Sequence, residues 1–412
     1  MRALALIAVL LPVAAEASAP DVFGFGARGF TLGNTLTATA ADFEAVYYNP
    51  AGLGFSKRPS VALGVQSGHF FLNIDGARTD TETAPAITVG LSVPLPLRGV
   101  LSERLVLGVG FVLPQTAVLV ADLDRPGVPR YVRIGARPQT VSIMGAAAVR
   151  ITDQLSVGAG FLALAELVGS IDVAPNASGE IGSTVVDDLL ADYSMIVGVH
   201  YAPLDWLTLG LVYRGQSDAD FNLPIETDLG EDFPLPVPTL DIRGTAQFDP
   251  AEVTLAAAAR VAAGLTVSGA VTWERWSTYP NPLVFTAVPD DYPAQPPPDF
   301  SDVVTFAASA QWQRRLGAWR VIPRGGIRIE PSPVPEQSGF HNYLDSTRLA
   351  LALGSGVERW GLRLDTGVQL SWMAPRSSDK TQLQPGLQNE VTDRIQHDGV
   401  FVAWSTELGA RF

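Results

Sequence analysis

The chain of 412 residues contains no cysteine, and charged residues make up only 17% of it. The absence of thiols excludes a disulfide framework, a thiolate metal site and a cysteine nucleophile. The four histidines lie far apart in the sequence without metal-ligand spacing, so we expect neither a metal site nor a cofactor. The formal net charge of −14 argues against a nucleic-acid partner, which would require a basic surface.

Long apolar runs are also scarce. The first, residues 3–15, follows Arg2 and precedes a small-residue pattern at 17–19, which is typical of a secretory signal peptide. It is too short to span a membrane as a helix, which takes about 20 residues. The other run, 253–271, alternates in its second half, and we interpret it as two strands around a tight turn. We therefore predict a signal peptide at 1–19 and an exported mature chain.

Strand-like alternation is what the sequence has in abundance. In the C-terminal stretch GVFVAWSTELGARF, Val402, Trp404 and Leu408 share an apolar face, whereas Ser405 and Glu407 lie on the other. A period of two indicates β-strands, because a helical face repeats every 3.6 residues. The candidate strands run for about 11 to 25 residues, whereas soluble strands usually have about five or six and about 9 to 11 cross a bilayer. This length favours a membrane barrel over a soluble sandwich.

We predict fourteen strands, with twelve or sixteen as the alternatives, closed into a barrel that satisfies every backbone polar group inside lipid. The links after the fourth, sixth, eighth, tenth and twelfth strands have only about two to four residues, and those after the odd strands from the fifth on have roughly 13 to 23. Short turns, and the C-terminus of an even-stranded barrel, belong on the periplasmic side. The predicted fold class is all-β, a 14-stranded antiparallel transmembrane β-barrel over 58–412 in the bacterial outer membrane. The predicted strands are 59–74, 84–95, 105–121, 132–150, 155–173, 189–202, 206–222, 238–262, 265–287, 302–316, 319–330, 344–358, 362–374 and 398–412.

Residues 20–57, which precede the first strand, do not alternate. They are rich in glycine, alanine and threonine, and they end in EAVYYNPAGLGF. They form either a periplasmic tail or a plug in the lumen, which a fourteen-stranded barrel is wide enough to hold. We predict a short helix over 39–47 that ends at Asn49, because proline disfavours helical geometry in the residue before it.

Four stretches, in order along the chain, resemble one family. GNTLTATAADFEAVYYNPAGL, LGLVYRGQSDADF, VTWERWSTY and GGIRIEPSPVPEQ are similar to segments of the FadL/TodX outer-membrane transporters of long-chain fatty acids and aromatic hydrocarbons. The resemblance implies a monomeric barrel whose N-terminal hatch, here 20–57, lies in the lumen. It also implies that outer loops capture a hydrophobic ligand, which leaves sideways into the outer-membrane lipid near a kink in the third strand.

Several residues acquire candidate roles from this resemblance. Asn49, Pro50 and Ala51 match the hatch motif. In the third strand, Pro114 offers no ladder donor, so a gap in the wall is expected near Pro114-Gln115, although a harmless bulge explains the proline equally well. The third outer loop is expected to form a short amphipathic helix that catches ligand with four exposed apolar residues: Val185, Val186, Leu189 and Leu190.

Three arginines share one face of a predicted strand. Arg320, Arg324 and Arg328 are candidates for binding the carboxylate head group of a ligand. The alternative is a lumenal ion-pair network with acidic residues such as Glu330 and Asp365.

These features predict a passive channel for hydrophobic molecules, with long-chain fatty acids as the first expectation and no catalytic residues. Aromatic or alkane hydrocarbons are the alternative ligands, and a general diffusion porin is the rival class. GFGARG at 24–29 matches a dinucleotide fingerprint, but it follows the cleavage site rather than a strand, so it does not indicate an enzyme.

Overall fold

The structure of the chain is a computed structural model. It describes residues 24–79, 85–99, 102, 104–115, 129–134, 141–175, 181–227, 240–281, 283–285, 297–337, 343–379 and 394–412. The predicted signal peptide lies outside these residues, and so does the outer end of the predicted third strand beyond residue 115.

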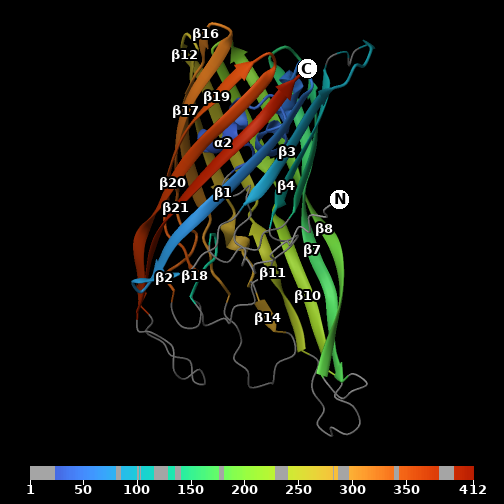
Figure 1. The fold of residues 1–412 in the computed structure, drawn as a ribbon, viewed down its shortest axis with the longest axis vertical. Helices are drawn as coiled ribbons and strands as arrows, with labels where there is room; N and C mark the ends of the chain where they lie inside the picture. The colour runs from blue at the N-terminus through green and yellow to red at the C-terminus, as the bar shows by residue number, and fades with distance from the viewer. Residues whose placement is uncertain are drawn as a thin grey trace, which may run out of the picture.

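The wall is a closed antiparallel β-barrel of fourteen strands, as predicted (Figure 1). It closes where β21 pairs with β1, from Ser60 opposite Arg411 to Ile74 opposite His397. Four of the wall strands are interrupted and carry two labels each, and the short β2 (Ala77–Thr79) folds back onto β1. The wall consists of β1 (Ser60–Ile74), β3 (Ala86–Pro94), β4 (Leu105–Pro114), β6 (Ser142–Arg150), β7 (Leu155–Pro175), β8 (Ile181–Leu204), β9 and β10 (Leu207–Arg214, Ser217–Thr227), β11 and β12 (Leu240–Asp249, Glu252–Ala262), β13 and β14 (Leu265–Glu274, Leu283–Phe285), β15 and β16 (Val303–Trp312, Arg314–Leu316), β17 (Trp319–Glu330), β19 (Arg348–Arg359), β20 (Leu362–Asp379) and β21 (Arg394–Arg411).

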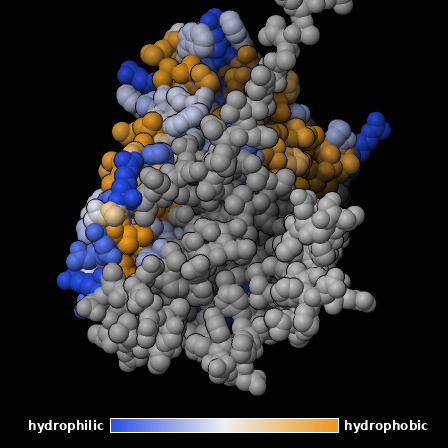
Figure 2. Space-filling model, turned by 60° about the horizontal axis from the view of Figure 1, so that its bottom comes forward, coloured by the Kyte–Doolittle hydropathy of each residue, from blue (hydrophilic) through white to orange (hydrophobic). Residues whose placement is uncertain are grey.

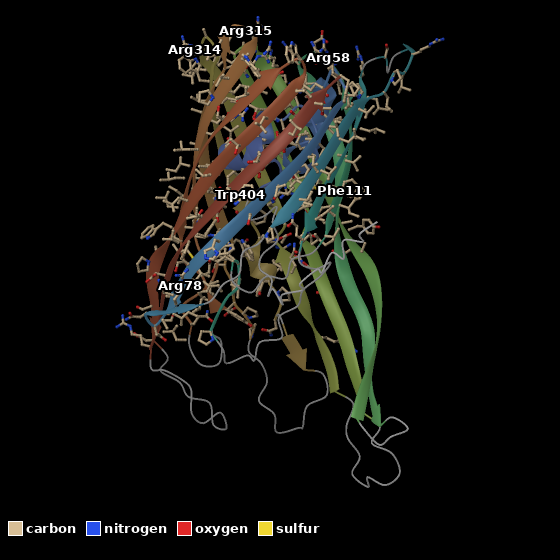
Figure 3. All side chains as sticks on the ribbon, viewed as in Figure 1. Arg58, Arg78, Phe111, Arg314, Arg315 and Trp404 are labelled. Carbon is tan, nitrogen blue, oxygen red and sulfur yellow. The ribbon has the colours of Figure 1, made fainter. Side chains whose placement is uncertain are left out.

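Alternation sorts the side chains onto two faces of this wall. In β21, Val402, Trp404 and Leu408 are exposed, whereas Ser405 and Glu407 are buried. Hydrophobic residues form broad areas on the flank of the barrel (Figure 2), and Trp404 lies on this outer face (Figure 3). An apolar outer band of this kind is the surface that a membrane barrel presents to lipid. Within the described residues, no helix has the length and apolar character needed to cross a membrane.

The two ends of the barrel differ in their connections. Tight turns join β12 to β13, β16 to β17 and β19 to β20 at the end where the C-terminus lies (Figure 1). In the last of these turns, Trp360 and Gly361 have φ angles of 55° and 80°, as a type I′ hairpin turn requires. Short turns mark this end as the periplasmic end and the opposite one as the outer end.

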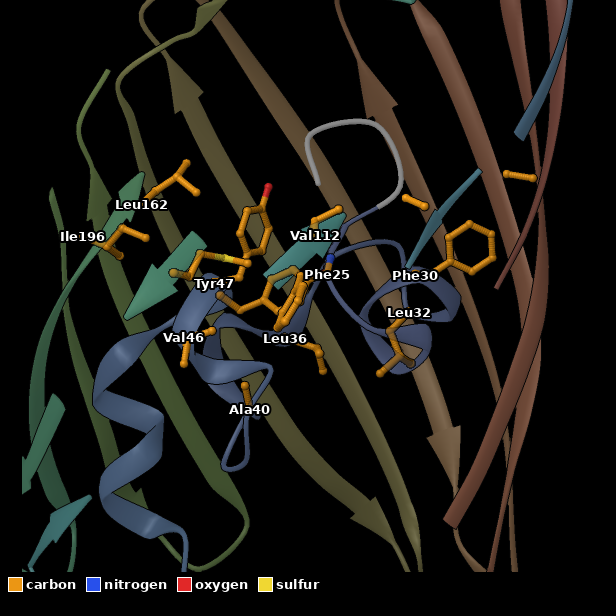
Figure 4. Packing of buried hydrophobic residues seen from close by; sticks show 14 of the residues in the cluster. Phe25, Phe30, Leu32, Leu36, Ala40, Val46, Tyr47, Val112, Leu162 and Ile196 are labelled. Carbon is orange, nitrogen blue, oxygen red and sulfur yellow. The ribbon is translucent and has the colours of Figure 1, made fainter. Parts of the chain in front are cut away.

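The N-terminal segment, residues 24–55, lies inside the barrel (Figure 1). Its side chains, such as Phe25 and Val46, belong to one buried cluster with Val112, Leu162 and Ile196 of the wall (Figure 4). The segment forms only short helices: α2 (Ala27–Thr31), η1 (Leu36–Ala38), α3 (Ala45–Tyr48) and η2 (Pro50–Phe55).

The helix predicted over 39–47 is shorter than expected, because only α3 is regular there. Asn49 ends α3 as predicted, with an extended φ of −167°, since Pro50 follows it.

The helix predicted in the third outer loop is wrong. Residues 181–190, which include Val185, Val186, Leu189 and Leu190, belong to β8, and they pair with β7 as far as Ile181 opposite Pro175. The ladder with β7 satisfies the backbone along the whole hairpin, and the β-branched run Thr184-Val185-Val186 favours an extended chain.

The fourth wall strand, predicted from residue 132, begins only at Ser142. Residues 129–134 leave the wall instead and enter the outer end of the barrel. There β5 (Arg130–Tyr131) pairs in parallel with β18 (Tyr343–Leu344), and Arg133 is buried.

Candidate functional site

Asn49 joins the N-terminal segment to the barrel wall. Its Nδ2 donates to the carbonyl oxygens of Thr37 at 2.8 Å and Val199 at 3.1 Å, and its Oδ1 accepts from the backbone N of Ala51 at 3.1 Å. Pro50 begins η2, a position where its missing N–H would have no helical partner anyway. The predicted motif therefore lies at the contact between segment and wall, and its gating role stays a prediction.

Two wall glycines make this contact possible. A Cβ at Gly158 of β7 would overlap the backbone of Pro50 and Ala51, and a Cβ at Gly198 of β8 would overlap the side chain of Asn49. Because glycine has no side chain, the two backbones approach one another directly. The inner surface of the wall is thus shaped to receive this segment.

A buried charge network holds another part of the N-terminal segment. Arg28 lies 2.8 Å from Asp42 (Nη2 to Oδ1) and 2.6 Å from Glu44 (Nε to Oε2). The backbone N of Ala27 donates to Glu407 of β21 at 3.2 Å. Burial alone would raise the pKa of Asp42, but Arg28 and two wall arginines outweigh it, and the pKa lies below its ordinary value of 3.8.

The wall contributes charges of both signs to the same network. Arg411 binds Asp42 at 2.8 Å (Nη2 to Oδ2). Asp365 receives both Arg324 Nη1 and Arg363 Nε at 2.5 Å. The segment and the wall therefore share one set of ion pairs. In the parts of the chain that the structure describes, no group of histidines and carboxylates has the arrangement of a metal site.

The three predicted arginines lie in three different surroundings. Arg320 is near the periplasmic end, 37% exposed, with Nη1 3.0 Å from Glu358. Arg324 belongs to the buried network just described. Arg328 binds Glu330 at 2.8 Å (Nε to Oε1) and also lines a cavity. All three take part in ion pairs, and Arg328 is the one that lines the larger of the two cavities described next.

Two small cavities lie between the N-terminal segment and the wall, and both are lined by Tyr47, Arg214 and Glu252. The larger, about 50 Å³, extends to Arg328, and the smaller, about 10 Å³, extends to Ser142 at the start of β6. Arg214 stands between them, donating to the carbonyl of Tyr47 at 2.7 Å and binding Glu252 at 2.5 Å. Small-molecule sites usually measure about 300–1,000 Å³. A ligand therefore passes here only if the N-terminal segment shifts.

The described strands end at different levels beside the smaller cavity. Within the described residues, which leave out 80–84, 116–128 and 135–140, β3, β4 and β6 extend outward to Ala86, Pro114 and Ser142, while β1 and β7 continue past these levels. The ladder between β4 and β6 ends at Val112 opposite Ser142. Gln115 N donates to the carbonyl preceding Ala86 at 3.1 Å, which means that the missing N–H of Pro114 faces β6. The gap in the wall expected near Pro114-Gln115 lies next to the described end of this ladder and stays a prediction.

An aromatic cluster fills the outer mouth, which is the part of the lumen between the N-terminal segment and the outer end of the barrel. The short helix η4 (Trp276–Thr278) places Trp276 in full burial beside Phe248 and Phe300. Tyr279 stacks on Phe300 with ring centroids 4.3 Å apart. Aromatic pairs of this kind contribute about 0.5–1.5 kcal/mol each beyond their buried area.

Arg133 holds the segment 129–134 in this mouth through ion pairs and a contact with Trp276. Its guanidinium lies over Trp276 at 5.0 Å and within 3.5 to 3.8 Å of three carboxylates, those of Glu274, Glu330 and Asp345. The sequence analysis did not single out Arg133, because the stretch RYVRIG alternates like one more wall strand. The buried acidic residues at the ends of β13 and β17 were the only signal for a buried cation.

Fold, apolar outer band and filled lumen together define a plugged barrel of the outer membrane. The chain matches, over residues 9–406, the family model described as outer membrane protein transport protein (OMPP1/FadL/TodX). It belongs to this family, whose members transport hydrophobic molecules across the outer membrane.

Solved structures share the fold at low sequence identity. A FadL homologue of Pseudomonas aeruginosa is 15% identical, with 94% of this chain and 98% of that chain covered and a TM-score of 0.66. The toluene transporter TodX of P. putida is 14% identical, with 95% and 99% covered and a TM-score of 0.57. The toluene transporter TbuX of Ralstonia pickettii is 15% identical, with 95% and 99% covered and a TM-score of 0.55. A comparison with curated proteins gives no match.

Proposed function

We propose that the protein is a passive channel for long-chain fatty acids, with the N-terminal segment as its hatch and the end of the ladder between β4 and β6, beside Pro114, as its exit. The observation that carries this proposal is the pair of cavities that share Tyr47, Arg214 and Glu252. They run from Arg328 toward the place where the ladder between β4 and β6 ends. A ligand that follows them leaves the lumen sideways, into lipid.

The sideways route has a physical advantage for an alkyl chain. Keeping the chain in water costs roughly 0.8 kcal/mol per exposed methylene, whereas lipid removes this cost. Downhill partition of the ligand into the membrane is then sufficient to drive release.

The polar lining of the cavities favours a ligand with an acidic head group. The lining of the larger cavity carries two arginines, Arg214 and Arg328, against one carboxylate, Glu252, and polar residues such as Tyr48 and Thr272. A carboxylate gains charge-assisted hydrogen bonds from such groups, and a hydrocarbon gains nothing from them.

A displacement titration on the refolded protein in detergent tests this proposal. A fluorescent long-chain fatty acid is bound first, and oleate, hexadecane and toluene are then added in separate experiments. We expect displacement by oleate alone. We also expect the variant Arg328→Gln to bind oleate about tenfold more weakly, the loss of one charged hydrogen bond. Arg320→Gln, which alters an arginine of the same strand away from the cavities, is the matched control and should bind normally.

Aromatic hydrocarbons are the second candidate, and the aromatic cluster at the outer mouth supports them. Displacement by toluene, with Arg328→Gln unchanged, would favour this ligand class over fatty acids. A protein that binds no probe but conducts ions steadily would instead be a porin.

The exit is tested separately with Pro114→Val. Valine restores an N–H that faces β6, so the ladder can extend and the opening should narrow. We expect slower transfer of fatty acid into vesicle lipid with unchanged binding. Pro323→Val, at a proline of β17 far along the wall, should leave transfer unaffected. Equal transfer by both variants would place the exit elsewhere.

A further inference from the structure

Basic side chains gather at the periplasmic end of the barrel, although the whole chain has a net charge of −14. Arg58, Arg314 and Arg315 at this end are labelled in Figure 3. Among the described residues, the turns and strand ends here carry twelve basic side chains and only three acidic ones, Asp153, Asp205 and Glu358. The basic residues are Lys57, Arg58, Arg98, Arg104, Arg150, Arg260, Arg314, Arg315, Arg320, Arg359, Arg363 and Arg411.

Two of these arginines belong to the lipid-facing side of the wall. Alternation places Arg314 on the same face as the exposed Trp312, and Arg359 on the same face as the exposed Leu351 and Leu353. The other lipid-facing positions of β13, β15, β17 and β19, and those of 362–372 in β20, are all uncharged. Charge on a lipid-facing surface costs about 2–4 kcal/mol at the bilayer midplane and about 0–1 kcal/mol near the interface. Both arginines therefore lie at the depth where lipid head groups begin.

Both guanidinium groups are stacked on tryptophan. The Arg314 Cζ lies 4.8 Å from the ring centre of Trp312. The Arg359 Cζ lies 3.7 Å from the ring centre of Trp360 and 4.7 Å from that of Trp319. Stacking uses the flat faces of a guanidinium and leaves its N–H groups at the edge available for hydrogen bonds.

Neither arginine is neutralised by a carboxylate within the described residues. Glu358, next to Arg359 in the chain, binds Arg320 at 3.0 Å instead. The Nε of Arg359 is buried without a hydrogen-bond partner, so its Nη groups are the donors that a lipid phosphate would meet. Arg314 is exposed and Arg359 is half-buried, and tryptophan holds both guanidinium groups at the depth of the head groups.

We propose that Arg314 on Trp312, and Arg359 on Trp319 and Trp360, bind the phosphates of anionic phospholipids in the periplasmic leaflet of the outer membrane. Guanidinium edges match phosphate oxygens in a bidentate manner. Tryptophan is the residue that anchors proteins at this depth of a membrane. Leu353 of β19 and Leu364 of β20, both exposed, continue the surface from Arg359 toward the acyl chains. An anionic lipid is favoured over a zwitterionic one, because an ammonium group would meet the basic end of the barrel.

Native mass spectrometry of the full-length protein in detergent tests this binding. The protein is titrated with phosphatidylglycerol or phosphatidylethanolamine of the same acyl chains, and retained lipids are counted. We expect at least one phosphatidylglycerol to be retained about tenfold more tightly than phosphatidylethanolamine, as one charge-assisted contact provides. The double variant Arg314→Gln/Arg359→Gln should lose this preference.

A control of equal charge separates these two positions from the general field of the basic end. Arg58→Gln/Arg98→Gln removes two exposed arginines of the same end that do not stack on tryptophan in the structure, and it should keep the preference. The Arg314→Lys/Arg359→Lys variant keeps the charge but lacks the planar edge, so it should lose most of the preference. Heat-modifiable mobility in gels confirms that each variant is folded. Equal retention of both lipids by the wild type, equal losses in the two glutamine variants, or full preference in the lysine variant would overturn the proposal.

Discussion

The lumen is closed at two levels, and the two closures are built differently. Toward the periplasm, the N-terminal segment meets the wall through a backbone contact at Gly158, through the Asn49 side chain at Gly198 and through a shared network of charges. At the outer mouth, the closure consists of side chains: an aromatic cluster around Trp276, and the guanidinium of Arg133 among three carboxylates.

The difference has consequences for movement. Where backbones touch, nothing can shift unless a whole segment moves with its ion pairs. Side chains close the outer mouth, so we expect it to open when Tyr279 rotates or when the segment 129–134 withdraws. Elements that move during function are usually the less stable ones. We therefore expect the outer mouth to open at a lower free-energy cost than the contact between the N-terminal segment and the wall.

The largest loss of stability is expected for Arg324→Gln. Its side chain is 1% exposed and lies 2.5 Å from Asp365, so removing it leaves a buried carboxylate with one fewer partner. Breaking a buried pair costs about 3–5 kcal/mol. Arg320→Gln, on the same strand and face but 37% exposed, should cost under about 1 kcal/mol. Equilibrium unfolding in urea with vesicle-bound protein measures both, and similar losses would show that the network is not a buried unit.

Gly158→Val should loosen the inner contact itself. A side chain there overlaps the backbone of Pro50 and Ala51, and overpacking of this kind costs about 1–3 kcal/mol. Because the segment must move away from the wall, single-channel conductance in planar bilayers should rise as well. The matched control is Gly269→Val, where the only neighbour of an added Cβ is the Ala307 carbonyl at 3.8 Å. If both variants conduct like the wild type, the segment does not block the lumen at this point.

How far the sequence predicts this molecule differs between wall and interior. Apolar and polar residues must alternate along a wall strand, because lipid lies on one side and the lumen on the other. Strands β20 and β21 can therefore be predicted from the sequence alone. The same rule misplaces 132–134, since RYVRIG alternates as well, and only the carboxylates of Glu274, Glu330 and Asp345 explain why Arg133 turns inward. No local pattern brings these residues together.

The structure inside the lumen depends on contacts that leave no repeating pattern in the sequence. Asn49 was found through its motif, but its bond to Val199 depends on strand register 150 residues away. The helix predicted at Val185, Val186, Leu189 and Leu190 is wrong. Apolar residues spaced by three and four favour a helix only when no neighbouring strand can pair with them, and here β7 pairs with all four.

Arg133→Gln should act on the outer mouth with a smaller effect on global stability than Arg324→Gln. The segment 129–134 can leave the mouth locally, which relieves the three carboxylates without unfolding the barrel. We expect the fluorescent fatty acid to associate about tenfold faster, within the range that single interface changes produce. Arg78→Gln removes an exposed arginine stacked on Phe71 at the outer end and should not change the rate. A stability loss as large as that of Arg324→Gln would place Arg133 among the groups that hold the barrel itself.

The smallest effect is expected for Asp42→Asn, as a difference in unfolding stability that depends on pH. The pKa of Asp42 results from burial, which raises it, and from Arg28, Arg363 and Arg411, which together bring it below 3.8. A carboxyl whose folded pKa is depressed contributes stability that is present above its unfolded pKa and is lost as the pH falls through the folded pKa. Wild type should therefore be more stable than Asp42→Asn at neutral pH, and the difference should shrink as the pH falls below about 4. Unfolding midpoints of both proteins across this range measure the effect. Because Glu44 shares Arg28 with Asp42, a difference that grows in acid would mean that Asp42 is held protonated and that the inner closure is not an ionic contact.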